Sequence, residues 1–386
     1  MKLRDFFQHT EQISTPAFYF DTDVFHNRVE FVKMELPKIP LTFSIKANPF
    51  LLNCLPDEIR HVEVCSPGEL KICKAYNIPG SRIIYSGVNK EIEDVTEAIV
   101  YGVDIATAES MLHVELEQKA AQKADTKQRV ILRLTSGNQF GMSEEDVLSI
   151  LADHTKYPNL DIYGIHYYSG TQKKKRQIDK DFEKLDAALS RLRERTGFVP
   201  RLVEVGPGFP VNYFNPPYDE SEKAALIENK DTILAFAEKY PLGIEIGRYF
   251  AASCGTYATK VMDVKNNGNI NYVICDGGIH HLKYYGQTLA MQVPEMEILN
   301  TSAEAKPYCI CGSLCTVADV LVREVELPVV SRNDVVLFHR CGAYSVTEGS
   351  ALFLSRKIPE VYLYNEANGL EKMRSFVDTT IINKKE

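Results

Sequence analysis

The chain has 386 residues, of which 45% are hydrophobic and 25% are charged, so we expect a globular protein that is long enough for two domains. Its formal net charge of −8 and its isoelectric point near 5.7 argue against a general nucleic-acid or membrane-surface binder. The amino-terminal stretch lacks a signal-peptide apolar region and no stretch is apolar for long enough to span a bilayer, which indicates a cytoplasmic protein without a membrane or nucleic-acid partner.

Short apolar, β-branched runs recur along the first two thirds of the chain, and stretches with helical periodicity such as 181–195 and 231–239 separate them. The runs are 43–45, 61–64, 82–85, 103–106, 129–134, 162–167, 201–205 and 242–246. Eight strands that alternate with helices predict an α/β fold, a (β/α)8 TIM barrel over residues 21–250.

The pattern changes after Arg248. Strand-like runs with short turns and few helical segments follow, at 255–264, 271–276, 324–328 and 334–339. This rhythm is typical of an antiparallel β domain, which we place at residues 251–386. Residues 1–20 contain a further strand-like run, AFYF at 17–20, and are predicted to join this second domain.

Two clusters of reactive side chains have plainer interpretations. The basic run KKKR at 173–176 is interpreted as a solvated loop or helix start. The nine cysteines are expected to be mostly free thiols in a reducing compartment. A zinc site is conceivable at one group of them, but its C-x-C-x3-C spacing is not that of zinc knuckles and its first two cysteines alternate as buried strand residues do, so we predict no metal site. The group comprises Cys309, Cys311, Cys315, His339 and Cys341.

Unusual residues fall at the carboxyl ends of the predicted barrel strands, where barrel enzymes carry their reactive groups. The first strand ends at Lys46, and a partly desolvated lysine can lose its proton and form a Schiff base. The sixth strand ends at His166. A surface lysine and a core histidine are the alternatives for each residue taken alone.

The ends of the seventh and eighth strands resemble a phosphate site. Gly206 and Gly208 follow the seventh strand, and Glu245, Gly247 and Arg248 follow the eighth. Backbone N–H groups beside glycines and a guanidinium suit a phosphate, which barrels commonly hold near their last two strands. The glycines as turn formers and Glu245 with Arg248 as a structural pair are the alternatives, but their coincidence with Lys46 and His166 favours a site.

A series of motifs in fixed order resembles the fold-type III pyridoxal-phosphate (PLP) decarboxylases, which include the diaminopimelate, ornithine and arginine decarboxylases. The motifs are SIKANP at 44–49, CSPGEL at 65–70, HYYSGTQ at 166–172, VGPGFP at 205–210, EIGR at 245–248, GSLCTVAD at 312–319 and GAYS at 342–345. The resemblance covers almost the whole chain. It implies a barrel of alanine-racemase type and PLP as the cofactor.

The resemblance also implies a role for each matching residue. Lys46 holds the cofactor as a Schiff base, His166 stacks on its ring, and Glu245 pairs with the pyridine nitrogen, so that a quinonoid carbanion is stabilised after CO2 leaves. Cys315 enters from a second subunit as a general acid, which implies an obligate homodimer with shared active sites. The phosphate is held by Ser169, Gly206, Gly208, Gly247 and Arg248, with Tyr344 beside it.

Departures from the family pattern bear on the substrate. Pro207 removes an N–H donor from the glycine loop, and Ile246 replaces a proline. Thr316 follows the motif cysteine, where decarboxylases of free basic amino acids carry an acid, and no acid follows Asp276 until Glu295. A cationic substrate end would be poorly compensated, which disfavours free ornithine or lysine, although Asp319 remains as an alternative acid.

Three features resemble instead a subgroup from antibiotic and siderophore pathways, such as the butirosin decarboxylase. They are DGGIHHL at 276–282, CT at 315–316 and QFG at 139–141. This subgroup implies an amino acid that is conjugated or tethered to an acyl carrier protein, for example a glutamyl thioester.

Three alternatives remain open. The first is a decarboxylase of free diaminopimelate or another free diamino acid, for which Arg340 and Arg356 leave room. The second is an amino-acid racemase of related fold, which the HYYSG and GSLCT motifs disfavour. The third is a non-catalytic regulatory binding protein of the same fold, which would have lost cofactor residues that are present here.

Overall fold

The structure is a computed structural model that describes residues 2–10, 13–300 and 304–385. Its contacts divide the chain into two compact units. A barrel unit comprises residues 28–211 and 220–250, and a β unit comprises the residues up to Asn27, residues 212–219 and those from Ala251 on. The segment 212–219, which interrupts the barrel sequence, therefore belongs to the β unit.

The barrel unit confirms the predicted fold. Its described residues form a closed barrel of eight parallel strands in sequential order, in which β2 pairs with both β3 and β9. The strands are β2 (Leu41–Ser44), β3 (Ile59–Val64), β4 (Ile83–Tyr85), β5 (Ile105–Ala108), β6 (Gln128–Leu134), β7 (Leu160–Tyr168), β8 (Leu202–Gly206) and β9 (Leu242–Ile246). Each overlaps one of the eight predicted runs.

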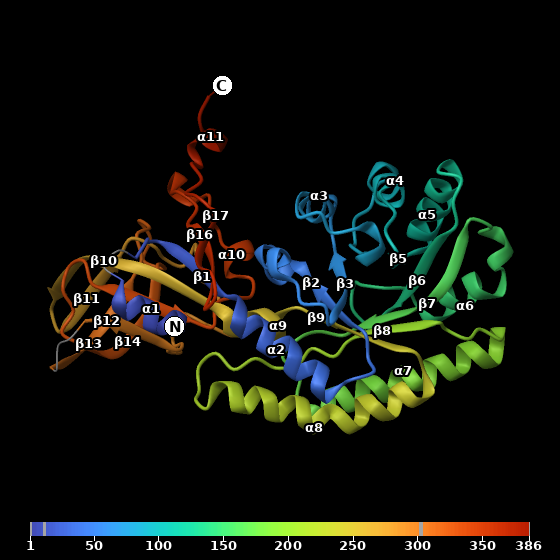
Figure 1. Ribbon diagram of the computed structural model, residues 1–386, viewed down its shortest axis with the longest axis horizontal. Coiled ribbons are helices and arrows are strands. Elements are labelled where there is room, and N and C mark those ends of the chain that lie inside the picture. The colour runs from blue at the N-terminus through green and yellow to red at the C-terminus, as the bar shows by residue number, and fades with distance from the viewer. Residues whose placement is uncertain (1, 11–12, 301–303, 386) are drawn as a thin grey trace. The chain divides into compact units, whose positions relative to one another are not determined.

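Helices surround these strands (Figure 1). They are α2 (Thr22–Glu35), α3 (Pro67–Ala75), α4 (Ile92–Tyr101), α5 (Met111–Lys123), α6 (Glu144–Ala152), α7 (Lys175–Thr196), α8 (Tyr218–Lys239) and α9 (Arg248–Ala251). Their ends carry expected signals. For example, the Ser66 hydroxyl accepts from the Glu69 amide at 3.1 Å before Pro67 begins α3, and α4 stops at Gly102 with a φ of 81°.

The barrel interior is apolar at one level and polar at another. Ile84, Ile105 and Ile131 form a buried cluster on the consecutive strands β4, β5 and β6. Glutamates and a histidine occupy buried positions on β3, β7, β8 and β9, namely Glu63, His166, Glu204 and Glu245. Because buried charged groups need partners, this polar level is where a site is expected.

The β unit contains a nine-stranded sheet among its described residues, ordered β14-β13-β11-β10-β1-β16-β17, with β15 paired to β10 and β12 to β15. Most pairs are antiparallel, as predicted, but β1–β16 and β11–β13 are parallel. Its strands are β1 (Ala17–Asp21), β10 (Gly255–Asn267), β11 (Ile270–Cys275), β12 (Met296–Leu299), β13 (Ala305–Cys311), β14 (Val320–Pro328), β15 (Val335–His339), β16 (Glu360–Asn365) and β17 (Gly369–Arg374). The AFYF run forms β1 and pairs with β10 in antiparallel register.

Short helices complete the β unit: α1 (Leu3–His9), α10 (Ser345–Glu348) and α11 (Thr380–Asn383). Among the described residues, no helix is long and apolar enough to cross a membrane.

Candidate active site

Lys46 lies directly after β2, in a 3-10 turn formed by Ile45–Ala47. The turn is followed at once by Asn48, whose side chain accepts from the Phe50 amide at 3.1 Å and caps the next turn. Gly247 approaches this turn closely, since a Cβ on it would lie 3.2 Å from the Ser44 Cβ and 3.3 Å from the Ala47 Cβ. The backbone around Lys46 is thus held on both sides.

Two buried carboxylates face the Lys46 amine. Nζ lies 2.6 Å from Glu63 Oε2 and 3.5 Å from Glu245 Oε1, and the Cys65 Sγ is also 3.5 Å away. The lysine side chain is 38% exposed, whereas those of Glu63 and Glu245 are 6% and 9% exposed. The amine is therefore open to a small molecule while its counter-charges are inside the barrel.

Glu245 is held in its ionised form. Burial alone would raise the pKa of this carboxyl, but the Lys46 charge and the hydrogen bond from His166 hold its pKa well below the usual range. His166 Nε2 lies 3.1 Å from Glu245 Oε2, and the histidine is itself buried. The Nδ1 atom of His166 has no hydrogen-bond partner among the described residues.

Ser44 ties the two carboxylates together. Its hydroxyl is within hydrogen-bond reach of Glu63 Oε2 at 2.9 Å and of Glu245 Oε1 at 2.5 Å. A third carboxyl, that of Glu204 on β8, lies deeper, and burial raises its pKa to about 8. The interior therefore combines one ionised and one neutral glutamate in neighbouring strands.

Glycines bring the loops after β7 and β8 together. Gly208 has a φ of +69°, and a Cβ there would lie 2.2 Å from the Gly170 carbonyl oxygen. A Cβ on Gly206 would lie 2.5 Å from the Tyr168 ring. The Lys173 amide donates to the Gly208 carbonyl at 3.0 Å, which closes the two loops on each other.

Ser169 and Lys173 share one acceptor beside this loop. The Ser169 hydroxyl donates to Asp181 Oδ2 at 2.5 Å, and Lys173 Nζ lies 2.9 Å from the same oxygen. The interpretation of the KKKR run as a wholly solvated segment is wrong for its first member. Lys174 and Arg176 are exposed and α7 begins at Lys175, but Lys173 is buried because Asp181 compensates its charge.

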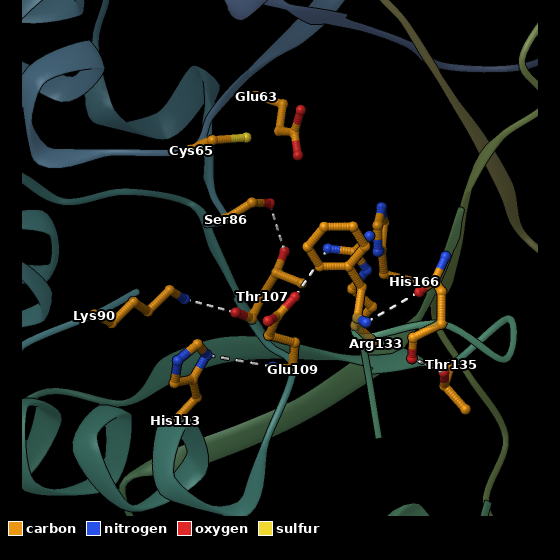
Figure 2. Close-up of polar contacts among 12 residues, drawn as sticks. Glu63, Cys65, Ser86, Lys90, Thr107, Glu109, His113, Arg133, Thr135 and His166 are labelled. Atoms are coloured by element: carbon orange, nitrogen blue, oxygen red, sulfur yellow. Dashed lines mark hydrogen bonds and ion pairs between the residues drawn. The ribbon is translucent and has the colours of Figure 1, made fainter. Parts of the chain in front are cut away.

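Sequence reasoning missed several polar groups of the barrel mouth. Glu63 escaped notice because it lies within the apolar run of β3, although a lone acid in such a run is itself a signal. Figure 2 shows a further set on β4, β5 and β6, where Ser86 contacts the Thr107 hydroxyl at 2.9 Å and Lys90 Nζ donates to the Thr107 carbonyl at 2.6 Å. Arg133 Nη1 pairs with Glu109 Oε2 at 2.9 Å.

The remaining candidate residues belong to the β unit. Cys315 and Thr316 are exposed on the loop after β13. Asp319 is buried and its carboxylate accepts from the amides of Ile279 at 2.8 Å and Leu314 at 2.7 Å. Tyr344 precedes α10 in the left-handed region with a φ of +69°, which is uncommon for a residue with a side chain.

The group considered for zinc is spread over this unit. The Cys309 and Cys311 sulfurs lie 3.8 Å apart on β13, where the strand prediction for them is confirmed. Cys315 is exposed and Cys341 is buried. Among the described residues, no group of three or more histidines, cysteines and acids is placed to hold a metal ion.

The barrel residues fit an aromatic aldehyde that carries a ring nitrogen and a phosphate. An accessible amine, a carboxylate held ionised inside the barrel and a buried histidine lie together, with glycine loops after the neighbouring strands. A family model described as the pyridoxal-binding domain of pyridoxal-dependent decarboxylases matches residues 23–252, which is more than half of the chain. The chain belongs to this family.

Curated relatives of this decarboxylase span nearly its whole length. A diaminopimelate decarboxylase from Bacteroides thetaiotaomicron is 24% identical, with 92% of this chain and 96% of the relative covered. An L-glutamyl-[BtrI acyl-carrier protein] decarboxylase from Niallia circulans is 27% identical over 96% and 94%. A 2-[(L-alanin-3-ylcarbamoyl)methyl]-2-hydroxybutanedioate decarboxylase from Staphylococcus aureus is 24% identical over 90% and 93%.

Solved structures confirm the fold of the decarboxylase. A crystal structure of diaminopimelate decarboxylase from M. jannaschii superposes with a TM-score of 0.87 at 20% identity, covering 97% of this chain and 93% of that one. The family model and the curated relatives confirm the enzyme class and the pyridoxal phosphate cofactor that the motifs implied.

Proposed function

We propose that this decarboxylase acts on an α-amino acid whose distal end is conjugated to another group or tethered to a carrier protein. The observation that carries the proposal is the environment of Asp319. Thr316 stands where decarboxylases of free basic amino acids carry an acid, and Asp319 is the alternative partner for a cationic substrate end. Asp319, however, is buried, and its carboxylate accepts hydrogen bonds from two backbone amides. A cationic distal group needs a carboxylate partner, whereas an amide or thioester linkage does not.

The substrates for which two relatives are named support the same class. The Niallia circulans enzyme acts on glutamate carried by a protein, and the Staphylococcus aureus enzyme acts on an alanine joined through a carbamoyl group to a hydroxy acid. In both, the amino acid that loses CO2 is attached to a larger molecule. The competing candidate is free diaminopimelate, which the Bacteroides thetaiotaomicron relative decarboxylates.

The residues of the barrel are assigned roles from their contacts. Pyridoxal phosphate, when bound, supplies an electron sink for the α-carbon that CO2 leaves. Lys46 would hold it through Nζ, and Glu63 at 2.6 Å is placed to take a proton from that amine, which must be neutral to react. Glu245, held ionised, would keep a proton on the ring nitrogen, and His166 orients Glu245 through its 3.1 Å contact.

The phosphate would lie at the glycine loops. Gly206, Gly208 and Gly247 leave room for close backbone approach, and Ser169 and Arg248 are the polar side chains assigned there. Tyr344 and Cys315 of the β unit complete the proposed set, with Cys315 as the group that returns a proton to the α-carbon.

A homodimer with shared active sites is part of the proposal. Several large apolar side chains of the β unit are exposed, as is common at protein–protein interfaces. They include Val317, which lies two residues after Cys315 and is 100% exposed, and also Leu289 and Met291. Inactive Lys46→Ala and Cys315→Ala chains, when mixed and allowed to exchange subunits, should regain about a quarter of the wild-type activity because half the dimers then hold one intact site. No recovery at all would contradict a site built from two subunits.

The substrate class is tested by a mass-spectrometric panel with the PLP-loaded protein, scored for loss of CO2. The panel contains free lysine, ornithine, arginine and diaminopimelate, together with carrier-bound glutamate and amide conjugates. Turnover of the conjugated members alone supports the proposal. Fast turnover of diaminopimelate with none of the conjugates would replace it with the competing candidate.

A further inference from the structure

Lys173 stands out because it is buried beside the proposed phosphate loop although Lys174 and Arg176 of the same basic run are exposed. It is 5% exposed. Its Cε lies 3.1 Å from the position that a Cβ on Gly208 would take, and its amide donates to the Gly208 carbonyl. The side chain and the backbone of the same residue therefore both meet the loop after β8.

The charge of Lys173 is paired with a carboxylate that reaches the phosphate residues. Lys173 Nζ lies 2.9 Å from Asp181 Oδ2. The same carboxylate accepts from the Ser169 hydroxyl at 2.5 Å and from the Tyr167 hydroxyl at 3.4 Å. Asp181 is thus a negative charge one hydrogen bond away from a serine that is assigned to an anion.

A carboxylate at this place opposes phosphate binding unless its charge is neutralised. An unpaired Asp181 would repel a phosphate dianion, and it would hold the single proton of the Ser169 hydroxyl more strongly than it does when paired with Lys173. The loop after β8 also has fewer backbone N–H donors for a phosphate than an all-glycine loop, since Pro207 has no N–H. A cation held next to Gly208 offsets both deficits.

We propose that Lys173 is a positioning residue of the cofactor site, which neutralises Asp181 so that Ser169 and the glycine loop can hold the phosphate of pyridoxal phosphate. The inference rests on the proposed assignment of the loops after β7 and β8 as the phosphate site. It gives the first lysine of the KKKR run a role that its neighbours Lys174 and Arg176 do not share.

The test measures preference for the phosphate group rather than turnover. The purified full-length protein is equilibrated by dialysis against pyridoxal 5′-phosphate or pyridoxal, and the ratio of the two dissociation constants is determined for each variant. Lys173→Met should lower this preference by about tenfold or more. The substitution removes the ion pair of Lys173 with Asp181, so that the negative charge of Asp181 is left to repel the phosphate. Its affinity for pyridoxal should stay close to that of the wild type.

Two further variants separate neutralisation from a purely structural contribution. In Lys173→Met/Asp181→Asn the repulsive charge is gone as well, so most of the preference should return, and Asp181→Asn alone should bind pyridoxal 5′-phosphate at least as tightly as the wild type. These variants also serve if Lys173→Met leaves Asp181 too poorly compensated to fold. A double variant as weak as the single one, or a comparable loss in Asp181→Asn, would overturn the inference.

Control variants locate a failure. Arg176→Met removes an exposed charge from the same basic run and should leave the preference unchanged; an equal loss there would mean that net charge alone explains the effect. Arg248→Met tests the phosphate site itself. If Arg248→Met lowers the preference and Lys173→Met does not, the role of Lys173 is refuted while the assignment of the phosphate site stands. If neither variant lowers the preference, both the role of Lys173 and the assignment of the phosphate site are refuted.

Discussion

Both ends of the barrel carry charged side chains but arrange them differently. At the carboxyl ends of the strands, Glu63 and Glu245 converge on the single amine of Lys46. At the amino ends, a cavity of about 860 Å³ is lined by charged side chains, among them the ion pairs of Lys230 with Glu35 and of Arg129 with Asp104. At that end the described residues place no accessible amine between buried acids, although a sizeable cavity with charged walls is present.

Burial distinguishes the charges at the Lys46 end from those at the opposite end. The carboxylates at the Lys46 end are at least nine-tenths buried, so their charges act through a medium that screens them little. In the cavity at the opposite end the Arg129 side chain is about half exposed, and pairs of that kind interact weakly. What marks the site is convergence of buried charge on one reactive group, and four substitutions test this distinction.

The largest effect is expected at the point of convergence. Lys46→Ala removes the amine that we propose holds the cofactor, and we expect at least about a 1000-fold loss of CO2 release together with the loss of the absorbance band of lysine-bound cofactor. The stopped assay and the spectrum are recorded on the same sample. A variant that kept the band would show that another amine holds the cofactor.

Glu245→Gln should come next. The amide cannot balance a protonated ring nitrogen, so the rate of decarboxylation should fall by about 100-fold or more while cofactor remains bound. The ratio of bound cofactor to protein and the single-turnover rate separate these two quantities. Full activity in Glu245→Gln would remove this residue from the chemistry and leave it a structural partner of His166.

The sequence pointed to candidate site residues where a residue was unusual for its position. Lys46, His166 and Glu245 were selected because a charged or titratable group at the end of an apolar strand is conspicuous, and the structure brings these three side chains together. The eight strands themselves were recognisable because parallel strands are buried on both faces and read as continuous apolar runs. The ends of these strands differ from the predicted ones by at most two residues, since periodicity marks a strand better than its limits.

The rest could not be read because it depends on tertiary partners. Glu63 lies inside an apolar run, and only the closed barrel places it 2.6 Å from Lys46. In the sequence Lys173 cannot be distinguished from the three basic residues that follow it. Its burial depends on the ion pair with Asp181, which lies in α7, eight residues later in the chain. Asp319 looked available to a substrate until its two backbone donors were visible.

Glu204 gives a smaller effect that appears in stability rather than rate. Its pKa is raised to about 8 by burial, against 4.5 for an ordinary glutamate, so the unfolded chain loses this proton at lower pH than the folded one. The contribution of Glu204 to the free energy of unfolding is therefore complete below about pH 4.5. It is lost as the pH rises toward 8, by at most about 1.4 kcal/mol per pH unit.

Glu204→Gln keeps the shape of the neutral acid and cannot ionise. Relative to the wild type, the variant should gain stability as the pH is raised from 5 to 8, and activity near pH 7 should change little. Urea unfolding at pH 5, 6.5 and 8 measures the difference. A stability difference that does not vary with pH would show that Glu204 is ionised in the folded protein throughout.

The smallest effect is expected at the opposite end of the barrel. Lys230 lines the cavity and its Nζ lies 2.9 Å from Glu35 Oε2, with the two side chains 35% and 16% exposed. Lys230→Met keeps the aliphatic stem and removes the charge, so we expect a loss of about 0.2–1 kcal/mol in the free energy of unfolding. Turnover and cofactor content should equal those of the wild type.

Glu35→Gln serves as the matched variant, because it breaks the same ion pair from the other side and should lower the free energy of unfolding by a similar amount. If either substitution lowered turnover more than about tenfold without a matching loss of stability, charge at the amino end would also serve the reaction, and convergence on Lys46 would no longer be a sufficient description of the site.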